Sequence, residues 1–134
     1  MATSPVMYRL AQNPADYRLC HALLRASDGP EVGFGFPTVM GVRDNALVGF
    51  LGTLKAKEAI VAGPLVMDPT MKAPGRYALR LLEVYEAVLA RAGVQSYIFG
   101  TDPANAVIQA FLDTLGLEPY ATDPTTNWYV KKVL

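Results

Sequence analysis

The chain has 134 residues and a mass of 14.5 kDa, which fits one domain with enough interior to fold without a disulfide or a metal ion. Twelve Lys and Arg residues balance twelve Asp and Glu residues, and 51% of the chain is hydrophobic, so the composition excludes intrinsic disorder and shows no basic footprint for nucleic acid or an anionic membrane. One cysteine and one histidine supply neither an internal disulfide nor the usual ligands of a zinc site, and we expect no metal.

The N-terminal residues lack a basic segment followed by a long apolar core, and the sequence contains no apolar run of 18 residues. We therefore expect a cytoplasmic protein that is neither secreted nor inserted in a membrane. The oligomeric state is left open by the sequence.

The first predicted elements are a strand at residues 6–10 and a helix that starts at Asn13-Pro14 and runs to about Arg25. One face of this helix carries Tyr17, Cys20, His21 and Leu24, and we expect it to pack on a sheet rather than to carry chemistry. Residues 27–37 hold three Gly, two Pro and two Phe, which predicts an irregular loop with apolar rings that could cover a site.

The clearest hairpin joins strands at residues 38–43 and 46–55 through Asp44-Asn45, two residue types that tolerate positive φ. The next strand, residues 59–67, contains Gly63 and Pro64, which predict a bulge or a local splay. Asp68-Pro69 closes that strand.

A helix is predicted from Pro74-Gly75 to Ala92, ended by Gly93, with a buried side made of Leu79, Leu82, Tyr85, Val88, Leu89 and Ala92. A strand at residues 96–101 follows, then a helix that begins after Asn105 and ends at Gly116, and finally strands at about 118–121 and 127–133. The strand-helix-strand unit from residue 59 to residue 101 predicts a parallel pair, with the segment 69–75 at its carboxyl edge, where ligands of α/β folds bind. The fold class is therefore mixed α/β.

That edge carries the chemistry-bearing residues. The helix starting at Gly75 offers unpaired N–H groups, and Lys72, Arg76 and Arg80 lie close by in the sequence, which suits a pyrophosphate. A capped surface helix with solvated basic residues explains the same spacing, so both interpretations stand at this point.

The whole arrangement resembles the GNAT acyltransferase superfamily, and the segment Lys72-Ala73-Pro74-Gly75-Arg76-Tyr77 is similar to its pyrophosphate motif Gln/Arg-x-x-Gly-x-Gly/Ala. The middle glycine matches, whereas Lys72, Tyr77 and Pro74 depart from the family pattern. Asn105, with Gly116-Leu117 eleven residues later, resembles the family's next helix, in which Leu112 stands where many members carry a tyrosine. Short, divergent chains of this kind resemble some proteins of tailed bacteriophages.

The resemblance implies one GNAT-like domain over residues 1–134, with a mixed, mostly antiparallel sheet, a splayed parallel strand pair and flanking helices. It implies N-acyl transfer with acetyl-CoA as co-substrate and a small-molecule or protein amine as acceptor. Since a short loop stands where members usually have a second helix before the hairpin, it implies an acceptor side that is either reduced or built from Phe34 and Phe36. The cofactor-binding residues that it implies are Leu65, Met67, Lys72, Ala73, Gly75, Arg76, Tyr77 and Asn105.

For the catalytic proton transfers the candidates are the carboxylates Glu58 and Asp102. Tyr85 and Tyr97 are alternative proton donors, although both are more typical of a core. The departures at Pro74, Tyr77 and Leu112 keep an alternative open, a GNAT-like domain that has lost catalysis and binds a partner protein. No Gly-x-Ser-x-Gly turn or phosphate-loop motif occurs, so neither a serine hydrolase nor a P-loop protein is supported.

Overall fold

The computed structural model describes residues 4–27, 29, 32–54, 59–72 and 74–133. The elements follow in the predicted order: β1 (Met7–Leu10), α1 (Pro14–Ala26), β2 (Phe34–Arg43), β3 (Ala46–Leu54), β4 (Val61–Met67), α2 (Gly75–Arg91), β5 (Ser96–Thr101), α3 (Ala106–Thr114), β6 (Ala121–Thr122) and β7 (Asn127–Lys132).

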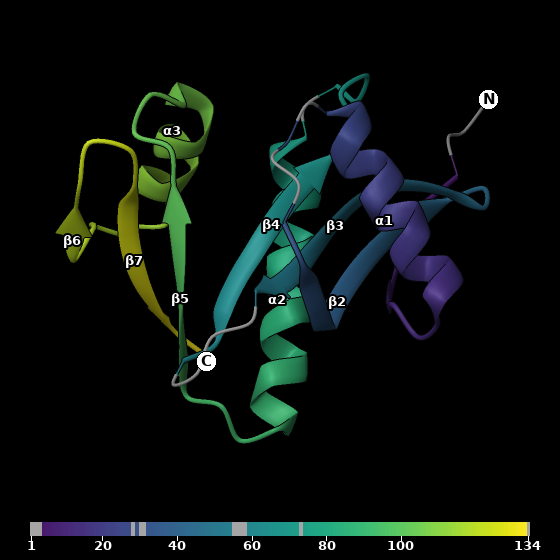
Figure 1. Cartoon of the computed structure of the whole chain (residues 1–134), viewed down its shortest axis with the longest axis horizontal. Coiled ribbons are helices and arrows are strands. Elements are labelled where there is room, and N and C mark those ends of the chain that lie inside the picture. Colours follow the sequence, from purple (N-terminus) through teal and green to yellow (C-terminus); the bar gives the residue numbers. More distant parts are fainter. Residues whose placement is uncertain (1–3, 28, 30–31, 55–58, 73, 134) are drawn as a thin grey trace.

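The described strands form one sheet in the order β1-β2-β3-β4-β5-β7-β6 (Figure 1). Within it every neighbouring pair is antiparallel except β4 and β5, which are parallel and joined through α2. This arrangement confirms the predicted mixed, mostly antiparallel sheet.

The two long helices cover opposite faces of the sheet (Figure 1). Cys20 and Leu24 of α1 share a core cluster with Met40 and Phe50. Leu81 and Tyr85 of α2 share a second cluster with the next residues along the same strands, Val39 and Leu51. Because successive side chains of a strand point to opposite faces, β2 and β3 are buried between α1 and α2.

Local sequence signals place the ends of several elements. Asp44 and Asn45 both have positive φ, 50° and 65°, as a two-residue hairpin turn requires, so the predicted hairpin is confirmed. Asn13 caps α1 by accepting a hydrogen bond from the Asp16 amide, with Pro14 as the first helical residue. Gly93, at φ 78°, ends α2 as predicted, and the Val94 amide donates back to the Leu89 carbonyl.

Three expectations are corrected. Residues 34–37 are not a loop but the start of β2, where Phe34 and Gly35 pair with Leu54 and Thr53 of β3. On α2, Tyr85 and Leu89 are buried as predicted, whereas Ala78 and Leu81 are buried in place of Leu79 and Leu82, and Ala92 is exposed. The strand expected at residues 118–121 is the shorter β6.

No helix in the described part of the chain is both long enough and apolar enough to cross a bilayer. Nor do the described residues bring three or more His, Cys, Asp or Glu side chains together as a metal ion would require.

Candidate cofactor site

The parallel strands β4 and β5 separate along their length. Their ladder contains one pair among the described residues, Val61 opposite Ile98, next to a hydrogen bond of 2.9 Å from the Ile98 amide to the Ile60 carbonyl. β4 keeps pairing with β3 as far as Met67, opposite Gly49, while β5 turns to β7 (Figure 1). Beyond Val61, one edge of β4 therefore has no strand partner in the part of the chain that the structure describes.

The residue register shows which backbone groups face this open edge. The Asp68 amide donates to the Val48 carbonyl at 2.8 Å, and the pairs Gly49–Met67, Phe50–Val66 and Leu51–Leu65 follow without interruption. Since backbone groups of an antiparallel strand point alternately to its two sides, Val66 bonds to β3, whereas the N–H and C=O groups of Leu65 and Met67 point toward β5.

The predicted strand defect lies at the start of the open edge. Gly63 and Pro64 stand opposite the single residue Gly52, between the Leu51–Leu65 and Thr53–Ala62 pairs, which is a β-bulge. Gly63 has φ 144°, a conformation that side-chain-bearing residues rarely adopt, so glycine is needed here. The bulge offsets β4 at the point where it leaves β5.

Among the described residues, one side-chain donor, the Ser27 hydroxyl, lies near the Met67 carbonyl. The Ser27 hydroxyl lies 3.5 Å from it, but the same hydroxyl is 2.9 Å from the Leu23 carbonyl. Because one hydroxyl has one proton and the Leu23 contact is shorter, the Met67 carbonyl keeps most of its accepting capacity.

The N-terminus of α2 follows β4 across a short loop. Pro74 is its N-cap and no side chain caps the helix, while the Tyr77 amide donates back to the Pro74 carbonyl at 3.1 Å. Gly75 is exposed, and a Cβ added there would meet nothing within 4 Å. The first amides of α2 thus face open space with the partial positive charge of a helix N-terminus.

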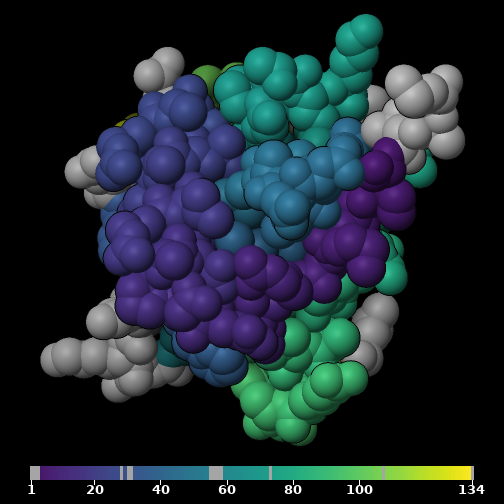
Figure 2. All heavy atoms as spheres, turned by 90° about the vertical axis from the view of Figure 1, so that its right-hand side faces the viewer, coloured from purple at the N-terminus to yellow at the C-terminus, as the bar shows by residue number. Residues whose placement is uncertain are grey.

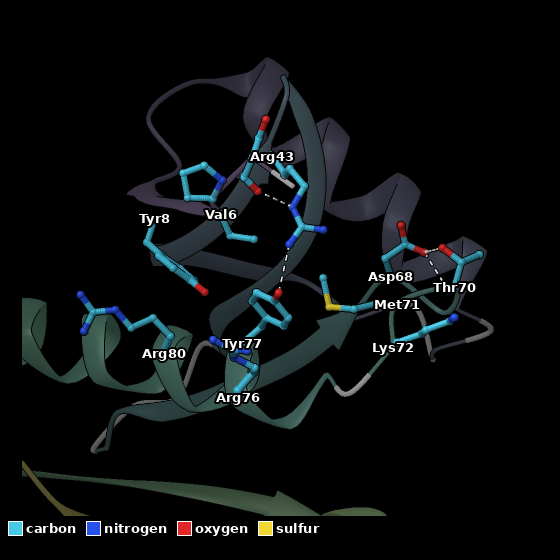
Figure 3. Close-up of a pocket in the computed structure, with 12 residues that line it drawn as sticks. Val6, Tyr8, Arg43, Asp68, Thr70, Met71, Lys72, Arg76, Tyr77 and Arg80 are labelled. Carbon is cyan, nitrogen blue, oxygen red and sulfur yellow. Dashed lines mark hydrogen bonds between the residues drawn. The ribbon is translucent and has the colours of Figure 1, made fainter. Parts of the chain in front are cut away.

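Of the basic residues near this turn, Lys72 and Arg76 are exposed, and the Arg76 guanidinium lies 5.6 Å from the centre of the Tyr77 ring. Tyr77 points away from the open edge of β4, toward β2, where its hydroxyl accepts a hydrogen bond of 3.0 Å from Arg43 (Figure 3). Since β2 is two strands away from β4, the ring leaves the separation between β4 and β5 unfilled.

Lys72, Arg76 and Tyr77 also line a cavity of about 820 Å³ on the flank of α2 that faces β1 and β2. Figure 2 shows the segments around it side by side, with the N-terminal residues in purple, the β2–β3 hairpin in blue and the β4–α2 loop in teal. Arg43 and Tyr8 belong to this cavity, and sequence reasoning missed both. The sequence signal for Arg43 is weak, a basic residue beside a hairpin turn.

Asp102 and Asn105 lie beyond the carboxyl end of β5, at the start of α3 (Figure 1). The Asp102 carboxylate accepts a hydrogen bond of 2.9 Å from the Ala104 amide, and Asn105 caps α3 by accepting one of 3.1 Å from the Ile108 amide. Both residues are exposed, and each has a local structural role at the end of β5. Glu58 and Ala73 lie outside the described residues.

The two alternative proton donors are core residues. The Tyr85 hydroxyl is 2.7 Å from that of Thr53, and the Tyr97 hydroxyl donates to Glu86 at 2.6 Å. Burial raises the pKa of both phenols, which makes them poorer acids at neutral pH. Leu112, at the position of the family's tyrosine, is 4% exposed.

The two phenylalanines expected at the acceptor side differ in exposure. Phe34 is buried and stacks on Phe50 at 5.1 Å between ring centres, so it belongs to the core. Phe36 is 72% exposed and alone remains available.

No protein-family model matches the sequence, and no curated protein matches it. Solved structures do match: an aminoglycoside 6'-acetyltransferase type Ii has a TM-score of 0.76 at 20% identity, covering 96% of this chain and 97% of that one. The GNAT family N-acetyltransferase YhbS of Escherichia coli, in complex with CoA, has a TM-score of 0.73 at 18% identity, covering 100% and 84%. Ard1 of Thermoplasma volcanium has a TM-score of 0.76 at 13% identity, covering 96% and 98%.

The chain therefore has the fold of the GNAT N-acetyltransferases. At these identities the similarity concerns the fold, and it agrees with the resemblance that the sequence carries at Lys72–Tyr77 and Asn105–Leu117.

Proposed function

We propose that the chain is an N-acyltransferase that uses acetyl-CoA. The observation that carries the proposal is the unpartnered edge of β4, which directs the backbone groups of Leu65 and Met67 toward the side that β5 leaves. An extended amide-containing chain such as pantetheine can pair with such an edge as an added strand. Fold similarity to acetyltransferases, one of them in complex with CoA, supports the same assignment.

The residues around the α2 N-terminus fit the pyrophosphate of this co-substrate. The amides of Gly75 and Arg76 supply donors, and the open space at Gly75 lets a phosphate approach the backbone. Lys72 and Arg76 supply charge, and Ala73, Tyr77 and Asn105 complete the proposed binding set. The Tyr77 amide already donates to the Pro74 carbonyl, and its side chain turns to Arg43, so its ring leaves the approach to the Gly75 and Arg76 amides open.

When bound, acetyl-CoA supplies a thioester: the acceptor nitrogen bonds to the acetyl carbon, the carbon–sulfur bond breaks, and the departing thiolate takes up a proton. The acceptor amine has to lose a proton, and Asp102 and Glu58 are the carboxylates proposed to accept it. Because Leu112 is apolar, the proton for the thiolate comes from water or from the acceptor itself. Holding the acceptor amine beside the thioester should lower the activation free energy by several kcal/mol, the order of magnitude that positioning contributes in other enzymes.

The acceptor is an amine, carried either by a small molecule or by a protein. Among the described residues near the start of β2, Phe36 offers an exposed aromatic surface for it. No observation in the structure favours the alternative of a non-catalytic partner-binding domain.

Calorimetric titration with acetyl-CoA, together with release of free thiol in the presence of amines, tests the proposal. Gly75→Asp places a carboxylate where the pyrophosphate would sit and is expected to abolish detectable binding. The same change adds a negative charge at a helix N-terminus, so it should leave the melting temperature unchanged or higher. Gly75→Ala is the matched control for bulk.

Two results would contradict the proposal. Absence of heat and of any thermal shift at millimolar acetyl-CoA would remove the transferase and leave the partner-binding alternative. Normal binding by Gly75→Asp would show that the pyrophosphate lies elsewhere.

A further inference from the structure

The cavity beside α2 concentrates positive charge in a chain whose formal net charge is zero. We call it the basic cavity. It is lined by the cations Arg43, Lys72, Arg76 and Arg80, by the rings of Tyr8 and Tyr77, and by one carboxylate, Asp68. Asp68 lies at the far end from Tyr8 (Figure 3), and hydrogen bonds from the Thr70 amide and hydroxyl hold its pKa below the usual range.

Few of these cations are neutralised. Among the described residues, one ion pair involves these cations. It joins Arg80 to Glu83 at 2.9 Å, and both side chains are more than half exposed. An exposed pair of this kind is worth little, about 0.2–1 kcal/mol. Arg43 instead donates to two neutral oxygens, the Ser4 carbonyl and the Tyr77 hydroxyl, both at 3.0 Å.

Three of the guanidinium groups lie against aromatic rings. Those of Arg43 and Arg76 lie 5.5 and 5.6 Å from the centre of the Tyr77 ring, and that of Arg80 lies 6.0 Å from the centre of the Tyr8 ring. Burial, followed by Tyr77, raises the pKa of Tyr8, while the positive charges of Arg80, Arg76 and Arg43 lower it, which agrees with the place of all three cations in the same cavity. Like charges gathered around neutral rings leave N–H donors for an anion.

We propose that the basic cavity binds a phosphate monoester, with Arg43 as its principal ligand. A dianionic phosphate matches a cavity lined by several guanidinium groups, whose planar N–H pairs fit its oxygens, and the Tyr8 and Val6 side chains offer surface to the group that carries it. This site adjoins the amides of the α2 N-terminus, because Lys72 and Arg76 lie at both, whereas Arg43, Arg80 and Tyr8 belong to the basic cavity alone.

Two sources can supply the phosphate, and they are distinguishable. One is the 3'-phosphate of CoA, an assignment that rests on the proposed function. The other is a separate phosphorylated molecule that binds beside the co-substrate.

Calorimetry with CoA, dephospho-CoA, adenosine 3',5'-bisphosphate and inorganic phosphate tests the proposal. The variants are Arg43→Gln and Arg80→Gln, and the control is Arg18→Gln, which removes an equal charge from an exposed position on α1. With CoA as the source, Arg43→Gln weakens CoA about tenfold and leaves dephospho-CoA unchanged, because it removes charge-assisted hydrogen bonds. Arg80→Gln has a smaller effect in the same direction, and Arg18→Gln has none.

With a separate ligand as the source, CoA and dephospho-CoA bind equally, and Arg43→Gln weakens inorganic phosphate and the bisphosphate. Arg43→Lys keeps the charge and is expected to retain part of the affinity. Because Arg43 also holds Ser4, each variant is first compared with the native protein by thermal melting, and Arg80→Gln tests the cavity without touching that contact.

The inference is overturned if neither Arg43→Gln nor Arg80→Gln changes the affinity for any phosphate-bearing ligand. If CoA does not bind while inorganic phosphate binds in an Arg43-dependent manner, the proposed function fails and the phosphate site stands.

Discussion

Asp16 is a buried carboxylate that ties α1 to β1. Both of its oxygens accept hydrogen bonds of 2.8 Å from Arg9, and the Gln12 amide adds another at 2.9 Å. The Arg9 hydrogen bonds, followed by that from Gln12, lower the pKa of Asp16 from 3.8 to about 2. The ion pair is half open to water at Arg9, so its strength lies in the hydrogen bonds more than in the charge.

The pH dependence of stability follows from that shift. The unfolded chain binds a proton at Asp16 more readily than the folded one, so this contribution is complete above about pH 4 and is lost as the pH falls toward about 2. Asp16→Asn should cost about 1–2 kcal/mol at pH 7 and flatten the acid limb of a urea-melting series. Asp113→Asn, at an exposed position, is the control. An unchanged acid limb in Asp16→Asn would show that the ion pair adds nothing.

Asn105 has a structural role that the structure shows and a binding role that we propose. Its Oδ1 accepts from the Ile108 amide, while the proposed contact with the co-substrate uses Nδ2. Asn105→Ala is expected to lower stability by about 1 kcal/mol through loss of the cap. Asn105→Asp restores the cap but has no amide nitrogen, so its melting temperature should match the native protein while its affinity for acetyl-CoA falls. Native affinity in Asn105→Asp would leave capping as the sole role.

Prediction from the sequence worked for residues whose role is local. The positive φ values at Asp44 and Asn45 and the cap at Asn13 follow from side chains acting on their own backbone. Arg43 was missed because its partners, Ser4 and Tyr77, are 39 and 34 residues away, and no local pattern encodes such a contact. The placement of Glu58 and Ala73 remains a prediction.

At the scale of elements, alanine substitutions at the two glycines that bound α2 should change the stability of the protein in opposite directions. Gly93 has φ 78°, and a Cβ there would meet nothing within 4 Å, so Gly93→Ala carries the conformational cost alone, about 1–2 kcal/mol. Gly75→Ala, in the first turn, should instead stabilise by about 0.4–1 kcal/mol. Chemical denaturation of both variants checks the opposite signs, and equal effects would refute the assigned helix ends.

The errors at this scale come from tertiary contacts that override local signals. Gly33, Gly35 and Pro37 are typical of a loop, yet pairing of Phe34 and Gly35 with β3 makes the segment a strand edge. In the first half of α2, Leu81 is buried rather than the predicted Leu82, because α2 packs on β2 and β3, where Val39 and Leu51 meet Leu81 and Tyr85. Periodicity finds a buried face but does not identify the strands under it.

At the scale of the whole molecule, the parallel pairing of β4 with β5 was predictable, and their separation was predictable in part. The crossover through α2 implies a parallel pair, and Gly63-Pro64 marks the bulge. The pairing of β7 with the other edge of β5 along its full length was not predictable. That pairing joins residues about 30 apart in sequence, from Ser96–Lys132 to Thr101–Asn127, and no local pattern reports it.

The proposed function requires that acetyl-CoA binds along the free edge of β4. Amide hydrogen exchange with and without CoA measures this residue by residue. In the free protein, the Leu65 and Met67 amides should exchange quickly and the Val66 amide slowly, because Val66 bonds to β3. Saturating CoA should slow Leu65 and Met67 at least tenfold while Val66 stays protected, and unchanged exchange at Leu65 and Met67 with CoA bound would contradict the account.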